Sequence, residues 1–120
     1  MRKTPMQVVQ GFGAGMASST DSWKEFIANE ITFDGPAAKV SGLDAFIELN
    51  EGFMSMVRGN RMKKAVEVDN YVITQVEIDV AMPTGKTITL DMSEWYETEN
   101  GKIKSIKVYY DAEEFRKESK

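Results

Sequence analysis

The sequence predicts an α+β fold in which helices cover one face of a curved antiparallel sheet. Apolar residues recur at helical spacing in three segments before residue 60, and they alternate with polar residues from residue 66 onward. Asn100-Gly101, between two alternating runs, is typical of a tight hairpin. Helices first and an antiparallel meander afterwards form the α+β pattern. The 120 residues have the size of one domain, so we treat residues 1–120 as a single unit.

The first helix is expected to begin at Pro5. Thr4 as N-cap, Pro5 at the first helical position and Gln7 at the third satisfy free amide groups together. Glycines at 11, 13 and 15 each cost about 0.5–1 kcal/mol relative to alanine, so a close approach to a sheet or pocket is expected to compensate. A dinucleotide-binding loop is excluded, because no strand precedes these glycines and the full G-x-G-x-x-G spacing is missing.

Two more helical segments and one strand are predicted before the sheet. Residues 18–30 form a short amphipathic piece, and a longer helix opens at Ser41 and reaches Gly59. Between them, residues 31–33 form a brief strand that ends in the turn Asp34-Gly35-Pro36.

Alternating runs predict the strands of the second half. The runs cover residues 66–82, interrupted by a reversal at Asp69-Asn70, and then 86–97 and 102–110. A short tail with helical character follows. No internal repeat is visible, and the order of elements indicates a meander.

Composition excludes several functional classes. A net charge of -4 disfavours polyphosphate binding, so nucleic acid is not expected as a partner. The chain has no cysteine and no histidine, so acid–base chemistry near neutral pH would need a carboxylate, tyrosine or lysine with a shifted pKa. Scattered carboxylates without histidine make a poor transition-metal site, and we expect no metal and no cofactor. The sequence lacks both a signal-peptide pattern and a membrane-span pattern, so we expect a cytoplasmic location.

Three features carry a family resemblance: a short strand ending in Asp-Gly-Pro, a helix opening on SGLDAF at residues 41–46, and a closing NGKIKSIKVYYDAEEF at residues 100–115. In this order and spacing they resemble the superfamily of nuclear transport factor 2, ketosteroid isomerase and the SnoaL-like proteins, over essentially the whole chain. The resemblance implies the cystatin-like/NTF2-like fold, a cone of strongly bent antiparallel sheet packed on three N-terminal helices around an apolar pocket. It also implies a homodimer, which we expect to form through the outer face of the sheet.

The resemblance implies a site that binds a small, mainly apolar carbonyl or polycyclic ligand and, for an enzyme, isomerises it by carboxylate acid–base catalysis. It places the catalytic base at Asp34 and a second acid at Asp91, which would stay protonated and donate a hydrogen bond. Phe12 falls where the isomerases have a tyrosine that shares this donation, and phenylalanine cannot donate. Phe12, Asn50 and Trp95 are expected in the ligand-pocket wall.

Several alternatives stay open at this stage. Asp34 is also a typical turn residue, and Asp91 lines the pocket only if its side of the strand faces inward, which is the orientation we expect. A SnoaL-like polyketide cyclase or hydrolase would use Asp111 or Glu77 instead, although Asp111 also suits a helix cap. A non-catalytic ligand-binding or dimerisation module is the third possibility, favoured by the missing tyrosine.

Overall fold

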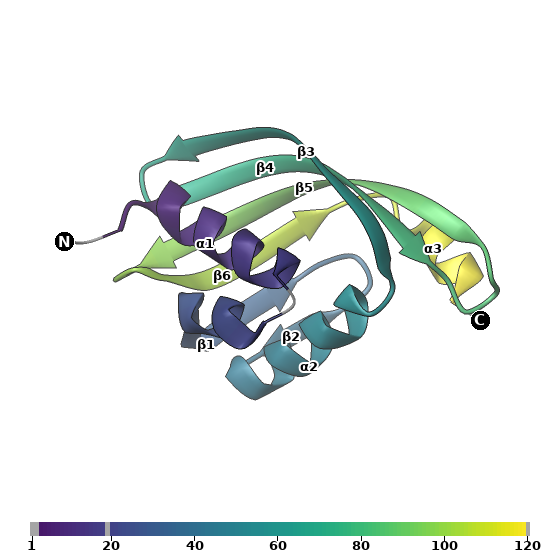
Figure 1. The fold of residues 1–120 in the computed structure, drawn as a ribbon, viewed down its shortest axis with the longest axis horizontal. Helices are drawn as coiled ribbons and strands as arrows, with labels where there is room; N and C mark the ends of the chain where they lie inside the picture. The colour runs from purple at the N-terminus through teal and green to yellow at the C-terminus, as the bar shows by residue number, and fades with distance from the viewer. Residues whose placement is uncertain (1–2, 19, 120) are drawn as a thin grey trace.

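The computed structural model describes residues 3–18 and 20–119, and within them it shows helices packed on one six-stranded sheet (Figure 1). The helical segments are α1 (Pro5–Ala17), the 3₁₀ helix η1 (Asp21–Phe26), α2 (Leu43–Met54) and α3 (Glu113–Glu118). The strands are β1 (Ile27–Asp34), β2 (Lys39–Ser41), β3 (Val57–Val68), β4 (Tyr71–Ala81), β5 (Thr87–Glu99) and β6 (Lys102–Tyr109). In the described residues, no helix is long and apolar enough to cross a membrane.

The sheet has the order β2-β1-β6-β5-β4-β3. Strands β3 to β6 form the predicted antiparallel meander, while β1 joins it by pairing parallel to β6. Segments α1, η1 and α2 lie on one side of the sheet, and α3 lies beyond its far end (Figure 1). The α+β cone expected from the sequence is therefore confirmed, with the helices against the concave face.

The start of α1 is the predicted one. Thr4 Oγ1 accepts a hydrogen bond from the Gln7 amide at 3.1 Å, and the Thr4 amide donates to Gln7 Oε1 at 2.9 Å. Gly11 and Gly15 of this helix allow a close approach, but to η1 rather than to the sheet or a pocket. A Cβ atom at Gly15 would lie 2.6 Å from the Trp23 backbone nitrogen.

The boundaries around α2 differ from the prediction. The chain forms β2 up to Ser41, and Gly42 then precedes α2 with φ at 93° while its amide donates to the Ile31 carbonyl at 2.7 Å. The helix ends at Met54, and Val57 already pairs with Val80 of β4. Pairing with neighbouring strands thus outweighs the helical spacing of the apolar residues at both ends of the segment, because tertiary contacts override local preference.

The core lies between the concave face and the helices. Side chains of β4 and β5 alternate between buried and accessible along the strands. Phe12 of α1, which is 3% exposed, contacts the rings of Trp23, Phe46 and Tyr96 with centroid separations of 6.0, 6.5 and 6.1 Å. These aromatic pairs hold α1 and α2 against the sheet, and their packing leaves a cavity next to α2.

Candidate functional site

An apolar cavity of about 200 Å³ lies between α2, the loop after β1, the concave face of the sheet and α3. Aromatic rings make up much of its wall: Phe33, Phe46, Phe53, Tyr110 and Phe115. Aliphatic and sulfur-containing side chains, among them Leu49, Ile78, Met92 and Val108, fill in the rest. Two polar residues also line it, Glu94 from β5 and Asn50 from α2.

Glu94 places a carboxyl group on the concave face. It lies opposite Thr74 of β4, and the Thr74 hydroxyl, on a residue only 2% exposed, donates to Glu94 Oε1 at 2.9 Å. Burial raises the pKa of the Glu94 carboxyl above its ordinary value, and the hydrogen bond from Thr74 and the nearby Tyr96 hydroxyl only partly oppose this shift. Burial also raises the pKa of Tyr96 well above 10, so its hydroxyl stays protonated beside the carboxyl. In the described part of the chain, no cationic group lies within 4.0 Å of Glu94.

Asn50 is held by two sulfur atoms. Its Nδ2 donates to Met16 Sδ at 3.4 Å and to Met54 Sδ at 3.5 Å. Thioether sulfur accepts hydrogen bonds but does not donate them, so these contacts fix the amide nitrogen on the sulfur side. The side-chain carbonyl of Asn50 is thereby turned away from both methionines.

The profile of the SnoaL-like domain family matches residues 8–106 of the chain. The chain belongs to the SnoaL-like family. This confirms the resemblance carried by the Asp-Gly-Pro turn and the closing hairpin. No curated protein sequence matches the chain with significance.

Solved structures share this SnoaL-like architecture. An NTF2-like protein of unknown function from Cytophaga hutchinsonii is 23% identical, with a TM-score of 0.81 and 97% of each chain covered. A putative SnoaL-like polyketide cyclase from Mesorhizobium loti is 20% identical, with a TM-score of 0.75, covering 90% of this chain and 100% of its own. A protein with a ketosteroid isomerase-like fold from Catenulispora acidiphila, in complex with trimethylamine, is 17% identical, with a TM-score of 0.75, covering 98% of this chain and 94% of its own. At these identities the likeness concerns the fold.

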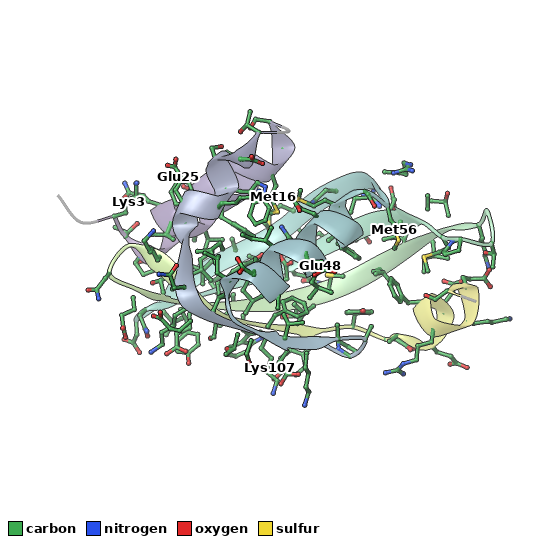
Figure 2. All side chains as sticks on the ribbon, turned by 90° about the horizontal axis from the view of Figure 1, so that it is seen from below. Lys3, Met16, Glu25, Glu48, Met56 and Lys107 are labelled. Atoms are coloured by element: carbon green, nitrogen blue, oxygen red, sulfur yellow. The ribbon has the colours of Figure 1, made fainter. Side chains whose placement is uncertain are left out.

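The two acids expected from the sequence lie outside the cavity of this SnoaL-like domain. Asp34 ends β1 with its side chain 43% exposed, 3.8 Å from Lys39 Nζ and 3.7 Å from Lys107 Nζ. Lys107 points away from the helices, on the outer side of the sheet (Figure 2). Asp91 is also exposed, next to Glu77 of β4 on the outer face. Neither carboxylate lines the interior cavity.

The expected inward orientation of Asp91 is therefore wrong, and its physical reason is the alternation of β5. Ile88, Leu90 and Met92 are 3–5% exposed and face the helices, because burying apolar surface stabilises the fold. Neighbouring positions in a strand point to opposite faces, so Asp91 and Trp95 must point outward. Trp95 is 41% exposed there and belongs to no wall of the cavity.

The remaining sequence-predicted residues have clear places. Asn50 lines the cavity, while Phe12 is core and does not. Asp111 Oδ1 accepts from the Glu113 amide at 3.0 Å, next to the start of α3, where Ala112 rather than Asp111 is the N-cap residue. Glu77 pairs with Arg61 and Lys63 at 3.2 Å on the outer face.

Glu94 is the candidate site residue that sequence reasoning missed, although the sequence contains a signal for it. Counting by two from Leu90 through Met92 leads to Glu94 and then to Tyr96, so Glu94 is one charged residue on an otherwise apolar face. Charged residues are almost never buried without a partner. A lone acid in such a series is therefore a candidate site residue.

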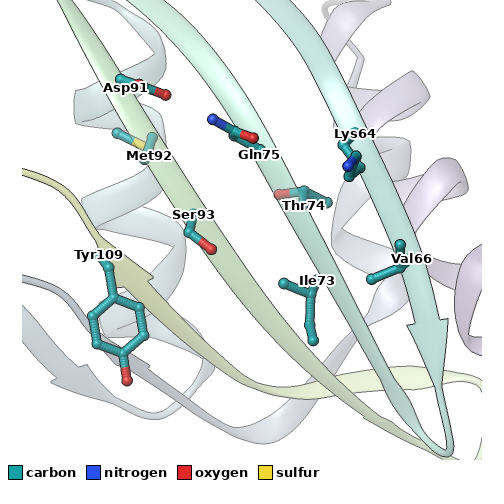
Figure 3. Close-up of a pocket in the computed structure, with 9 residues that line it drawn as sticks. All are labelled: Lys64, Val66, Ile73, Thr74, Gln75, Asp91, Met92, Ser93 and Tyr109. Carbon is teal, nitrogen blue, oxygen red and sulfur yellow. The ribbon is translucent and has the colours of Figure 1, made fainter.

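A second depression lies on the outer face, and Figure 3 shows it with the helices behind the sheet. Asp91, Ser93, Gln75, Lys64, Val66, Ile73 and Tyr109 are among its lining residues. Its volume is about 420 Å³, but it is shallow and open. This surface is a face of the sheet rather than an enclosed site.

Proposed function

We propose that this SnoaL-like domain binds a small, mainly apolar molecule in the interior cavity, with a polar group of the ligand against Glu94. The observation that carries the proposal is a single carboxyl group, among the described residues of the wall, in an otherwise largely aromatic and aliphatic cavity. An apolar pocket with a few convergent polar groups is the usual form of a small-molecule site. Buried carboxyl groups with shifted pKa values also concentrate at functional sites.

The volume limits the size of the ligand. An apolar protein cavity of about 150 Å³ holds benzene. At about 200 Å³, this cavity accommodates one ring with a short substituent. We therefore favour a ligand of that size over the polycyclic compounds expected from the sequence.

Binding is tested with acetophenone, which combines one ring with a carbonyl group, by isothermal titration calorimetry. Ala38 lines the cavity, so Ala38→Phe places a ring inside it, whereas Ala45→Phe adds the same ring to an exposed position of α2. We expect Ala38→Phe to weaken binding by about tenfold or more and Ala45→Phe to leave it unchanged. Equal binding by both variants would show that the ligand occupies another surface.

If the domain is an enzyme, we place the acid–base role on Glu94. This residue contacts the cavity, whereas Asp34 and Asp91 do not, and their catalytic roles stay predictions. Proton removal next to a carbonyl is measurable as deuterium exchange of phenylacetone in heavy water, followed by NMR. We expect Glu94→Gln to abolish enzyme-dependent exchange. Loss of exchange in Asp34→Asn together with full exchange in Glu94→Gln would restore the sequence-based assignment.

We also propose that two copies associate through the outer face of the sheet. Large apolar side chains are exposed there: Val66, Val68, Trp95 and Tyr109 at 43, 53, 41 and 51%. Exposed apolar patches of this kind mark interaction sites in folded proteins. The cytoplasmic location expected from the sequence stays a prediction.

A further inference from the structure

Two polar residues of the cavity wall, Glu94 and Asn50, offer hydrogen-bond acceptors. Glu94 reaches it from β5, and an ionised carboxylate has about four acceptor positions, of which Thr74 occupies one. Asn50 reaches it from α2 with its amide nitrogen already donated to Met16 and Met54. No described residue donates a hydrogen bond to Asn50 Oδ1. Every fully buried side-chain oxygen or nitrogen in the described part of the chain has a hydrogen-bond partner, so Asn50 Oδ1 is not fully buried and is accessible.

The walls add a preference for positive charge. Five aromatic rings surround the space, and the faces of such rings attract cations. No lysine or arginine occurs among the described residues that line it. An anionic ligand would meet a carboxyl group with no compensating cation, which is unfavourable in an apolar cavity.

We infer that the ligand is a protonated amine, an ammonium group carried on an apolar body of about one ring. The inference rests on the proposed function, since it names the chemical class of the ligand for the same cavity. An ammonium group brings up to three donors to Glu94 and Asn50, whereas a carbonyl group brings only acceptors. The ammonium group would then form the ion pair with Glu94 that no described lysine or arginine forms.

Binding is coupled to the protonation of Glu94. Burial raises the pKa of its carboxyl group. An ammonium ion stabilises the carboxylate, so a carboxyl group that is protonated before binding loses its proton to the buffer as the O–H bond breaks, and the carboxylate then pairs with the cation. The other titratable groups at the site are the hydroxyls of Tyr110 in the wall and Tyr96 beside Glu94, and burial raises the pKa of each. Both hydroxyls stay protonated at neutral pH, so neither supplies the released proton.

Isothermal titration calorimetry with three matched probes tests the inference: benzylamine, benzyl alcohol and benzoate, at pH 7 in phosphate and in Tris. The two buffers differ in ionisation enthalpy, so the difference in measured heat reports any proton that Glu94 releases. We expect benzylamine to bind about tenfold or more tightly than benzyl alcohol, and benzoate not to bind. Glu94→Gln should weaken benzylamine by about tenfold or more and change benzyl alcohol by less than about threefold.

The outcomes separate this inference from the proposed function. If benzyl alcohol or acetophenone binds as tightly as benzylamine, or if Glu94→Gln leaves benzylamine unaffected, the amine class is wrong while the cavity remains a ligand site. If no probe binds in a manner that Ala38→Phe blocks, both proposals fail. Circular dichroism of Glu94→Gln establishes that the variant is folded before its heats are compared.

Discussion

At the scale of single residues, Glu94 lies in an apolar environment that disfavours its charge, but neighbouring hydroxyl groups hold its carboxyl group in place. Removing a carboxyl group from water disfavours its charged form, and the surrounding apolar side chains offer it no hydrogen bonds or opposite charge in place of water. Thr74 and Tyr96 nevertheless hold hydroxyl groups against it. A titratable residue that lowers stability, yet is held in place by its neighbours, is typical of a ligand-binding or catalytic site.

The burial of Glu94 predicts a pH dependence of stability. The folded-state pKa lies above the ordinary 4.5, so between these two values the folded protein binds more protons than the unfolded chain. The free energy of unfolding therefore falls as pH rises through that window, by about 1.4 kcal/mol for each unit of pKa difference. Glu94→Gln lacks this loss, so its stability relative to the natural protein should increase as pH rises above 4.5, measured by urea denaturation.

Thr74→Val provides the matched comparison. It removes the hydrogen bond that opposes the upward pKa shift, at a position only 2% exposed. The pH-dependent loss should then extend to higher pH than in the natural protein. Parallel stability curves for the natural protein and Glu94→Gln, at all pH values, would show that the carboxyl is not desolvated.

The sequence could place a candidate site in this part of the cone, but it did not place Glu94 in the wall of the cavity. A shift of one residue in a strand exchanges the two faces, so Asp91 and Glu94 lie on opposite sides although only two residues separate them. Family placement favoured Asp91, whereas the apolar series through Leu90 and Met92 favoured Glu94. Burial of the apolar side chains decides between these faces, and that energy outweighs any preference of a single carboxylate.

At the scale of elements, the glycines of α1 yield a matched pair of variants. A Cβ at Gly15 would lie 2.6 and 2.8 Å from backbone atoms of Trp23, whereas a Cβ at Gly13 would meet no atom within 4 Å. Gly15→Ala should destabilise the fold by about 1–3 kcal/mol, because η1 must move away from α1. Gly13→Ala should stabilise it by about 0.5–1 kcal/mol through helix propensity alone.

Urea denaturation of both variants measures the difference. Stabilisation by Gly15→Ala would mean that η1 does not pack closely against α1. Loss of stability in Gly13→Ala would mean that its side of the helix is covered.

Element types were easier to predict than element ends. The capping box of Thr4 and Gln7 and the turn at Asn100-Gly101 are local, and both occur as predicted, with φ at 53° for Asn100 and 78° for Gly101. The parallel pairing of β1 with β6 depends on residues about 70 positions apart meeting in the fold, as Asp34 and Lys107 do. Periodicity carries no information about such partners.

At the scale of the whole molecule, the concave and outer faces of the sheet differ in what covers them. The concave face is covered by helices and encloses the cavity. On the outer face, Val66, Ile73 and Trp95 form a row across β3, β4 and β5, since each is paired with the next in register. A sheet surface with such a row is suited to association with another copy, which would leave the cavity on the far side of each sheet unobstructed.

The proposed association predicts a concentration-dependent dimer in analytical ultracentrifugation. Trp95→Lys and Val66→Lys should each raise the dimer dissociation constant by about tenfold or more, because each places a charge at the centre of the contact. Met62→Lys is the control. Met62 is 57% exposed but pairs with Val76, whose side chain faces the helices, so a lysine there should leave the dimer intact. A monomeric mass for the natural protein at all concentrations would exclude the association, and an equal effect of all three lysines would place the contact elsewhere.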